Sequence, residues 1–361
     1  MNESFIDYLR LLLLPFSLLY GVVIRVRNAL YDWGWLKQIA FDLPVIVVGN
    51  LEAGGTGKSP MIEYMIRLLG RDYKLATLSR GYGRQSRGYL EVHPESTASF
   101  VGDEPLQFKR KFPNITVAVC ERRVLGVRRL KESHDLVLLD DAYQHRSLKP
   151  GLSVLLFNYG SFTRFPFLLP AGNFRDNFSA RGRADVMVVT KCPIELGSSE
   201  RQQLQQWLAV RGKKIPVLFS TIAYGELEPL GTKVSAKTAH ERPSLKGKEI
   251  LLVTGIARPQ PFLDYIRAQG AEVEHIPFSD HHTFTPQDLA EVRRRFQDLA
   301  GERKLILTTE KDAVRLADKS LQASLHDLPI YFVPIRLNFI ESDGQIFREL
   351  LSGYLRTTIS S

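Results

Sequence analysis

The stretch from Val48 to Pro60, VGNLEAGGTGKSP, has the composition of a phosphate-binding loop. The strict motif is G-x-x-x-x-G-K-[ST], and Gly57, Lys58 and Ser59 match its last three positions. Glu52 stands where the first glycine is expected, so the loop departs from the strict pattern at one position. An apolar run precedes the loop and a helical pattern follows it, which is the context that such a loop requires.

Each residue type of this loop has a use in holding a triphosphate. Backbone N–H groups of a glycine-rich turn can surround phosphate oxygens, the lysine reaches the β- and γ-phosphates, and the hydroxyl binds Mg²⁺. The alternative is a glycine-rich turn with an incidental Gly-Lys-Ser. On the first interpretation the nucleotide-binding residues are Gly54, Gly55, Thr56, Gly57, Lys58 and Ser59.

A second acidic motif follows in DLVLLDDAYQH, where an apolar run ends in Asp140 and Asp141. Ligands of open α/β sheets bind at the carboxyl ends of the strands, so these acids are placed to hold the Mg²⁺ of a nucleotide. The alternative is that they cap a turn. With Ser59 they form the predicted metal site.

The sequence favours ATP over GTP. GTPases read guanine with Asn/Thr-Lys-x-Asp at a strand end, and VVTKCP supplies Thr190 and Lys191 but has Pro193 at the acid position.

Two further clusters could act on an acceptor. VGDEP contains Asp103 and Glu104 on a predicted loop, where adjacent acids are usually solvated. FSDHHTF contains His281 between Asp280 and His282, but no distant third ligand indicates a metal site. A carboxylate base oriented by a histidine is the better use, because phosphoryl transfer to an alcohol needs an acceptor for the hydroxyl proton.

Composition sets the class of partner. The chain has 361 residues, a formal net charge of +9 and only two cysteines, Cys120 and Cys192. The charge suits an anionic ligand, and the cysteines indicate neither a disulfide framework nor a zinc site. Basic residues gather in CERRVLGVRRLK, which reads as a solvated helix face, and in LLPAGNFRDNFSARGRADV, which suits anion recognition. We find no nucleic-acid module and no feature that indicates a protein partner.

The N-terminal segment is apolar and carries no charge between Arg10 and Arg25. A spanning helix needs roughly twenty apolar residues, so this stretch is too short. On a helix its polar residues fall in a narrow stripe, and such a wide apolar face is typical of a helix lying in the membrane interface. The alternative is a helix that docks on the protein's own core, kinked at Pro15.

Continuous apolar runs alternate with helical patterns from residue 44 onward, which predicts a parallel sheet covered on both faces. A polar, turn-rich stretch then separates a second α/β region. We therefore expect an α/β protein with a P-loop NTPase-like domain at 43–220, a connecting region at 221–248, a smaller C-terminal α/β unit at 249–361 and an apolar helix region at 1–42. The last helix could pack back on the core. Thr285 and Pro286 predict a capped helix start.

Several motifs together resemble one family. They are GNLEAGGTGKSP, LSRGYGR, VGDEP, LLDDAYQH, LLPAGNFRD, TGIARP, DHH and TTEKDAVRL, and they occur over nearly the whole chain in the family's order. The chain resembles the tetraacyldisaccharide 4'-kinases, the LpxK family of lipid A biosynthesis, whose loop itself has the GGTGKS form. The resemblance implies transfer of the γ-phosphate of ATP to the 4'-hydroxyl of a tetraacyldisaccharide 1-phosphate, giving lipid IVA. It also implies Mg²⁺ as cofactor and a peripheral position, through the N-terminal helix, at the cytoplasmic face of the inner membrane of a Gram-negative bacterium.

The resemblance also implies roles for residues. Asp103 resembles the family's catalytic base and His281 its partner, while Asp141, with Asp140 beside it, is the metal-linked acid. Weaker candidates for contact with substrate or nucleotide are Tyr82, Glu104, Arg123, Gln144, His145 and Arg175. One departure is the acid after Arg175, usually a glutamate in the family and Asp176 here.

Two other classes of function use the same loop. A membrane-associated P-loop switch or assembly ATPase would hydrolyse nucleotide without a lipid acceptor. An ATP-dependent ligase would need an amine or acid acceptor.

Overall fold

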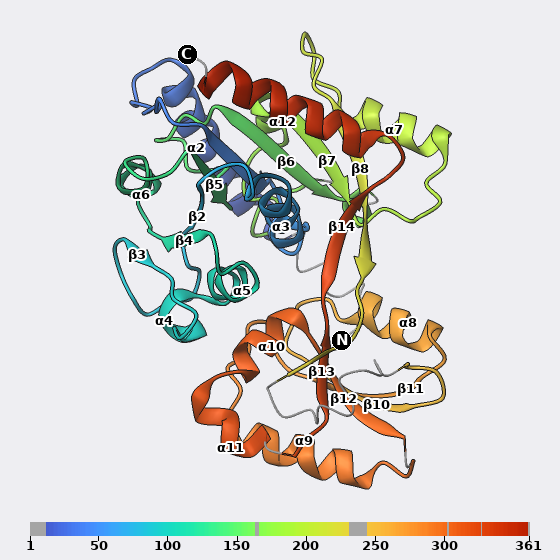
Figure 1. Ribbon diagram of the computed structural model, residues 1–361. Coiled ribbons are helices and arrows are strands. Elements are labelled where there is room, and N and C mark those ends of the chain that lie inside the picture. Colours follow the sequence, from blue (N-terminus) through green and yellow to red (C-terminus); the bar gives the residue numbers. More distant parts are fainter. Residues whose placement is uncertain (1–11, 163–165, 231–243, 302, 326, 360–361) are drawn as a thin grey trace.

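The computed structural model describes residues 12–162, 166–230, 244–301, 303–325 and 327–359, which form two α/β units (Figure 1). We call them the core unit and the C-terminal unit. The core unit is built on a nine-stranded sheet in the order β14-β8-β7-β6-β1-β5-β2-β4-β3. Its strands are β1 (Val45–Asn50), β2 (Leu75–Ser79), β3 (Leu90–Glu91), β4 (Thr116–Val119), β5 (Leu136–Asp140), β6 (Leu152–Asn158), β7 (Val186–Thr190), β8 (Val217–Tyr224) and β14 (Ile335–Phe339).

The centre of this sheet is parallel and covered on both faces, as the sequence predicted. Strands β1, β5, β6 and β7 are buried at every residue, which explains why they read as unbroken apolar runs. One face packs against α3 (Lys58–Leu69), α5 (Asp103–Lys111) and α12 (Asp343–Ile359), and the other against α6 (Arg123–Leu130) and α7 (Ser198–Leu208). The short helix α4 (Ala98–Val101) precedes α5.

The C-terminal unit has a five-stranded sheet in the order β11-β10-β12-β13-β9. Helix α9 begins at Pro286 with a capping box between Thr285 and Asp288, which confirms the predicted helix start. The elements of this unit are β9 (Glu228–Pro229), β10 (Glu249–Thr254), α8 (Gln260–Ala268), β11 (Glu272–Pro277), α9 (Pro286–Asp298), β12 (Lys304–Thr309), α10 (Glu310–Leu316), α11 (Gln322–Leu325) and β13 (Ile330–Val333).

Two chain segments join the units, and their course corrects the expected boundaries. β8 continues to Tyr224, inside the stretch that we expected to be a connection, and β9 already pairs with the C-terminal sheet. β14, expected in the C-terminal unit, instead pairs antiparallel with β8 at the edge of the large sheet. The two crossing segments are bonded to each other, from Gly225 N–H to the Pro334 carbonyl at 2.7 Å. Helix α12 then packs on the core unit (Figure 1).

Helix α2 (Leu14–Asp32) lies on the core unit with Ser17, Gly21 and Ile24 buried. Ser17 donates to the Leu168 carbonyl at 2.9 Å, and Asn28 donates to Asp176 at 2.9 Å. Pro15 lies in the first turn, so it does not kink the helix. Asp7 and Arg10 of the predicted polar stripe lie outside the described residues. No helix in the described part of the chain is both long and apolar enough to cross a bilayer.

Candidate active site

The loop between β1 and α3 has the backbone of a phosphate-binding loop. Gly54 and Gly57 have φ of 109° and 83°, values that favour glycine. Thr56 is fixed from both sides, since its hydroxyl accepts from Asn50 at 2.7 Å and its carbonyl accepts from the Thr190 hydroxyl at 2.8 Å. Helix α3 starts directly after Gly57, so its N-terminal N–H groups face the space enclosed by the loop.

Glu52, at the position of the missing glycine, turns its side chain away from this space. The side chain is 5% exposed and accepts a hydrogen bond from the Ser161 hydroxyl. Burial raises the pKa of the Glu52 carboxyl. A carboxylate at this position is therefore compatible with the loop, because the η1 turn (Tyr159–Ser161) supplies the hydroxyl that bonds to it.

The two acids after the β5 run have different surroundings. Asp141, with φ of 51°, accepts from Arg175 at 3.0 Å and lies 3.8 Å from the Lys58 ammonium. These two cations outweigh burial and lower the pKa of Asp141. Asp140 is 1% exposed, and burial, followed by the charges of Glu104 and Asp141, raises its pKa to about 7.

A cluster of oxygen ligands beside the loop fits Mg²⁺. Asp140 Oδ1 is buried and has no hydrogen-bond partner among the described residues, so it can accept a cation. Ser59 Oγ donates to Glu104 Oε1 at 2.8 Å, which places a hydroxyl and a second carboxylate at the same end of the loop. No group of three or more His, Cys, Asp or Glu in the described ranges forms a metal site by itself. Mg²⁺ is usually held by one or two protein carboxylates together with substrate phosphates.

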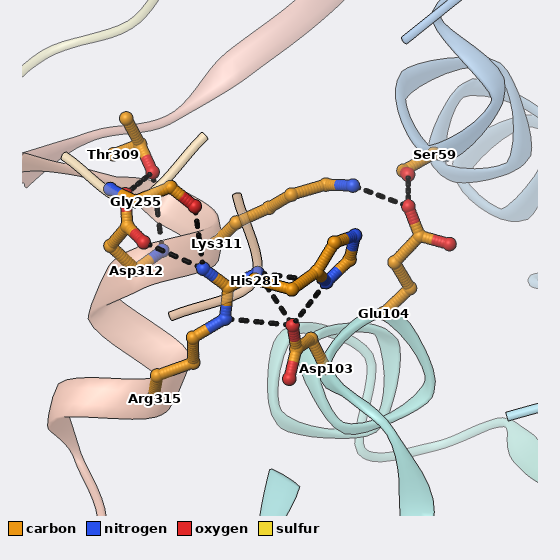
Figure 2. Close-up of polar contacts among 9 residues, drawn as sticks. All are labelled: Ser59, Asp103, Glu104, Gly255, His281, Thr309, Lys311, Asp312 and Arg315. Carbon is orange, nitrogen blue, oxygen red and sulfur yellow. Dashed lines mark hydrogen bonds and ion pairs between the residues drawn. The ribbon is translucent and has the colours of Figure 1, made fainter. Parts of the chain in front are cut away.

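The predicted base and its predicted partner meet across the two units. Asp103 begins α5 of the core unit, and its Oδ2 lies 3.0 Å from His281 Nδ1 of the C-terminal unit (Figure 2). His281 has φ of 58°, an uncommon value outside glycine that often marks a functional position. His282 instead pairs with Asp288 at 2.9 Å, within its own unit. Of the two histidines, His281 is the one that reaches the core unit.

Arg315 holds this pair from α10, and the sequence interpretation did not single it out. Its Nε donates to Asp103 Oδ2 at 2.7 Å, and its Nη1 donates to Asp312 at 2.8 Å. Asp312 is fully buried and also accepts from the backbone N–H of Gly255 at 3.0 Å. Although burial opposes ionisation, the bonds from His281 and Arg315 lower the pKa of Asp103, so the carboxylate stays ionised at neutral pH.

The weaker candidates lie around the same strand ends. Tyr82 is 78% exposed, and its ring centroid lies 5.7 Å from that of His281. Gln144 donates to the Asn50 carbonyl at 2.7 Å, and Arg123 is buried and donates to the Cys120 carbonyl at 3.0 Å. Burial, then Arg123 and Arg80, lower the pKa of His145 to about 4, so this imidazole is neutral at pH 7.

Three cations of the site, Lys191, Lys311 and Arg315, were not among the predicted site residues. Lys191, with φ of 58°, has its ammonium beside Gly55, and Lys311 pairs with Glu104 (Figure 2). Burial, then the charges of Arg258 and Lys311, lower the pKa of Lys191 to about 8. A signal for two of them was present, because Lys311 and Arg315 are four residues apart in TTEKDAVRL and share one helix face.

Comparison with known proteins agrees with this geometry. The family model for tetraacyldisaccharide-1-P 4'-kinase (LpxK) matches residues 9–356. The tetraacyldisaccharide 4'-kinase of Bacteroides thetaiotaomicron is 41% identical over 99% of this chain and 96% of the relative. That of Flavobacterium johnsoniae is 42% identical over 96% and 99%. A crystal structure described as the "apo" form of LpxK from Aquifex aeolicus in complex with ATP has a TM-score of 0.71, is 28% identical and covers 96% of this chain and 99% of its own.

The family model and both relatives span almost the whole chain, and the phosphate-binding loop and the Asp103–His281 pair lie within the matched region. The chain therefore belongs to the tetraacyldisaccharide 4'-kinase family.

Proposed function

We propose that the protein transfers the γ-phosphate of ATP to the 4'-hydroxyl of tetraacyldisaccharide 1-phosphate and forms lipid IVA. The observation that carries this proposal is the contact between Asp103 and His281, 3.0 Å apart, beside the phosphate-binding loop. A base at this position serves transfer to an alcohol, whereas a nucleotide switch needs only a positioned water. The identity of the acceptor follows from membership in the family.

Each end of the reaction has its own group of residues. The loop from Gly54 to Ser59 holds the triphosphate, and Lys58 offsets charge on the phosphoryl group that moves. The Asp103 carboxylate accepts the proton of the 4'-hydroxyl while that oxygen attacks the γ-phosphorus, and the bond to the β-phosphate oxygen breaks to release ADP. His281 and Arg315 orient Asp103 by the contacts that they make with its Oδ2.

Mg²⁺ would be held by Ser59 and Asp140, with Glu104 and Asp141 beside them. When bound, it supplies positive charge to the β- and γ-phosphate oxygens. On the acceptor side, Tyr82, which lies beside His281, is a candidate for binding the sugar and its phosphate, and Arg123, Gln144 and His145 are further candidates.

The acceptor is a lipid, so we propose that α2 places the protein on the cytoplasmic face of the inner membrane. The outward face of α2 carries apolar side chains that are 53–71% exposed, and Trp33 and Trp35 follow at 71% and 77%. An exposed apolar face flanked by tryptophans is typical of a helix at the membrane interface. The outward apolar residues of α2 are Phe16, Leu18, Leu19, Val22, Val23 and Val26.

The decisive experiment is transfer of labelled γ-phosphate from ATP to tetraacyldisaccharide 1-phosphate in detergent micelles. We expect label in a bisphosphorylated lipid. Label found only as free phosphate, at a rate independent of the lipid, would contradict the proposal and indicate a switch or assembly ATPase.

Membrane binding is tested separately by flotation with vesicles of phosphatidylethanolamine and phosphatidylglycerol. The variant Phe16→Ser/Leu19→Ser should float less than the wild type, while Ile346→Ser, which alters an exposed apolar residue of α12, should not. Equal flotation of all three would contradict the role of α2.

A further inference from the structure

Lys311 is carried by the C-terminal unit, but its ammonium is bonded in the core unit. It lies in the first turn of α10, and its Nζ pairs with Oε1 of Glu104 (Figure 2). The same carboxylate oxygen accepts from Ser59 Oγ at 2.8 Å. One oxygen thus connects a lysine of one unit with the loop hydroxyl of the other, at the end of the loop where Mg²⁺ would be held.

The ion pair is open to exchange. The side chains of Lys311 and Glu104 are 34% and 27% exposed, so a solvated cation can reach the carboxylate. A divalent cation held at Ser59 and Asp140 would compete with Lys311 for the neighbouring Glu104 carboxylate, and the ammonium would then lose its partner. The terminal phosphate of the nucleotide, bound at the same end of the loop, would then supply a new anionic partner.

The start of α10, which carries Lys311, is held by several hydrogen bonds, although the Lys311 ammonium itself can change its partner. Thr309 caps α10 and accepts from Asp312 N–H at 3.1 Å. The buried Asp312 is fixed in turn by Gly255 and Arg315. One turn along the same face, Arg315 contacts Asp103, so α10 presents one cation to the base and a second toward the phosphate site.

We propose that Lys311 is a catalytic cation that pairs with Glu104 in the nucleotide-free enzyme and with the oxygens of the transferred phosphoryl group when ATP is bound. This inference rests on the proposed function. The ammonium keeps its proton throughout: Asp103 takes the hydroxyl proton, and Lys311 stabilises the charge on the phosphoryl oxygens as they pass from ADP to the lipid oxygen.

The proposal predicts that Lys311 affects the binding of ATP and of ADP differently, so nucleotide affinity tests it independently of turnover. ADP has no γ-phosphate, so binding Mg²⁺·ADP breaks the Lys311–Glu104 pair without a replacement. Removing the lysine should therefore leave Mg²⁺·ADP binding unchanged or tighter, while it weakens binding of Mg²⁺ with the β,γ-methylene analogue of ATP. A pair that only holds the units together would weaken both nucleotides alike.

The experiment compares Lys311→Met with Lys319→Met, a variant at an exposed lysine of the same unit that contacts none of these groups. Calorimetric titration measures both nucleotides in Mg²⁺, and γ-phosphate transfer to the lipid measures kcat. We expect kcat of Lys311→Met to fall roughly 10²–10³-fold, as for loss of one preorganised donor to transition-state charge. The ratio of the analogue's Kd to that of ADP should rise at least several-fold, whereas Lys319→Met should match the wild type in both.

The variant Lys311→Arg keeps the charge and should recover part of kcat and most of the nucleotide discrimination. An unchanged kcat and an unchanged Kd ratio in Lys311→Met would overturn the proposal, as would a uniform loss of both nucleotides together with a lower melting temperature. The Kd ratio needs no acceptor, so a wild-type enzyme that discriminates through Lys311 but does not label the lipid would contradict the proposed function alone.

Discussion

Among the polar contacts that join the core unit to the C-terminal unit, besides the Lys311–Glu104 pair, two sets differ in kind. The first, which we call the anchor, consists of Glu63 of α3, Lys111 of α5 and Glu310 of α10. Lys111 contacts Glu63 at 2.7 Å and also pairs with Glu310, whose second oxygen accepts from Ile335 N–H at 3.4 Å where the chain enters β14. The second, the catalytic contact, consists of Asp103, His281 and Arg315.

The anchor residues are largely buried, and their backbone dihedral angles are ordinary. The side chains of Glu63 and Glu310 are 2% and 9% exposed, each has a cation partner, and the anchor residues have no positive φ. The catalytic region has the opposite character. Positive φ occurs at His281, Asp141 and Lys191, and Asp140 keeps an unpartnered buried oxygen. Three residues with positive φ and one unpartnered carboxylate oxygen thus lie where a ligand would bind, while the same helices are held together at their other ends.

The largest expected effect is loss of the base at the catalytic contact. Asp103→Asn keeps the shape of the side chain but cannot accept the hydroxyl proton. We expect kcat to fall about 10²–10⁴-fold, the usual contribution of a general base, with the Kd for ATP nearly unchanged. Phosphate transfer to the lipid and calorimetric titration with Mg²⁺·ATP measure the two quantities. If transfer stays close to the wild-type rate, Asp103 is not the base.

The matched change at the anchor should affect stability instead. Lys111→Met leaves Glu63 and Glu310 buried without their shared cation. Removing one partner of a buried pair costs about 3–5 kcal/mol, and we expect the lower end because Lys111 is 21% exposed. Urea unfolding measures the loss, and kcat of the folded variant should stay close to wild type.

Adding Glu310→Gln to Lys111→Met tests the reason for that loss. Neutralising the uncompensated carboxylate should restore part of the stability. An undiminished free energy of unfolding in Lys111→Met, with a large loss of kcat, would remove the distinction between the two sets of contacts.

A smaller effect is expected in the pH dependence of kcat/KM for ATP, which should fall at high pH. Lys191 lies beside Gly55, and its pKa is lowered to about 8 by burial and then by Arg258 and Lys311. Its charge, which would attract the triphosphate, is complete well below pH 8 and is lost as the pH rises through 8. We therefore expect kcat/KM for ATP to fall about tenfold from pH 7 to pH 9, since this ratio reports groups of the free enzyme. Lys191→Arg should be flat over this range, and a limb retained in that variant would assign it to another group.

The sequence was sufficient for the parts of the molecule that depend on local pattern. Unbroken apolar runs predicted the parallel sheet, and the adjacent residues Gly57, Lys58 and Ser59 predicted the loop, because both patterns involve residues that are neighbours in the sequence. Asp103 and His281 are 178 residues apart, so only the resemblance to a family suggested their pairing before the fold placed them 3.0 Å apart. Strand β14 fell in the stretch assigned to the C-terminal unit, because a strand of 5 residues does not indicate which sheet it joins.

Helix α2 shows why the polar stripe alone was ambiguous. A narrow polar face fits a helix in a membrane, and the same face fits a helix that bonds to its own protein. In the fold Ser17 and Asn28 of the polar stripe bond to the core unit and Ile24 is buried beside them, while most of the apolar side chains point outward. Asp176, the residue that departs from the family's usual glutamate, is fully buried. Its carboxylate accepts one hydrogen bond from Asn28 and one from Arg183, each at 2.9 Å. The acid after Arg175 therefore ties α2 to the core unit, which explains why a shorter carboxylate is accommodated next to an arginine that contacts Asp141.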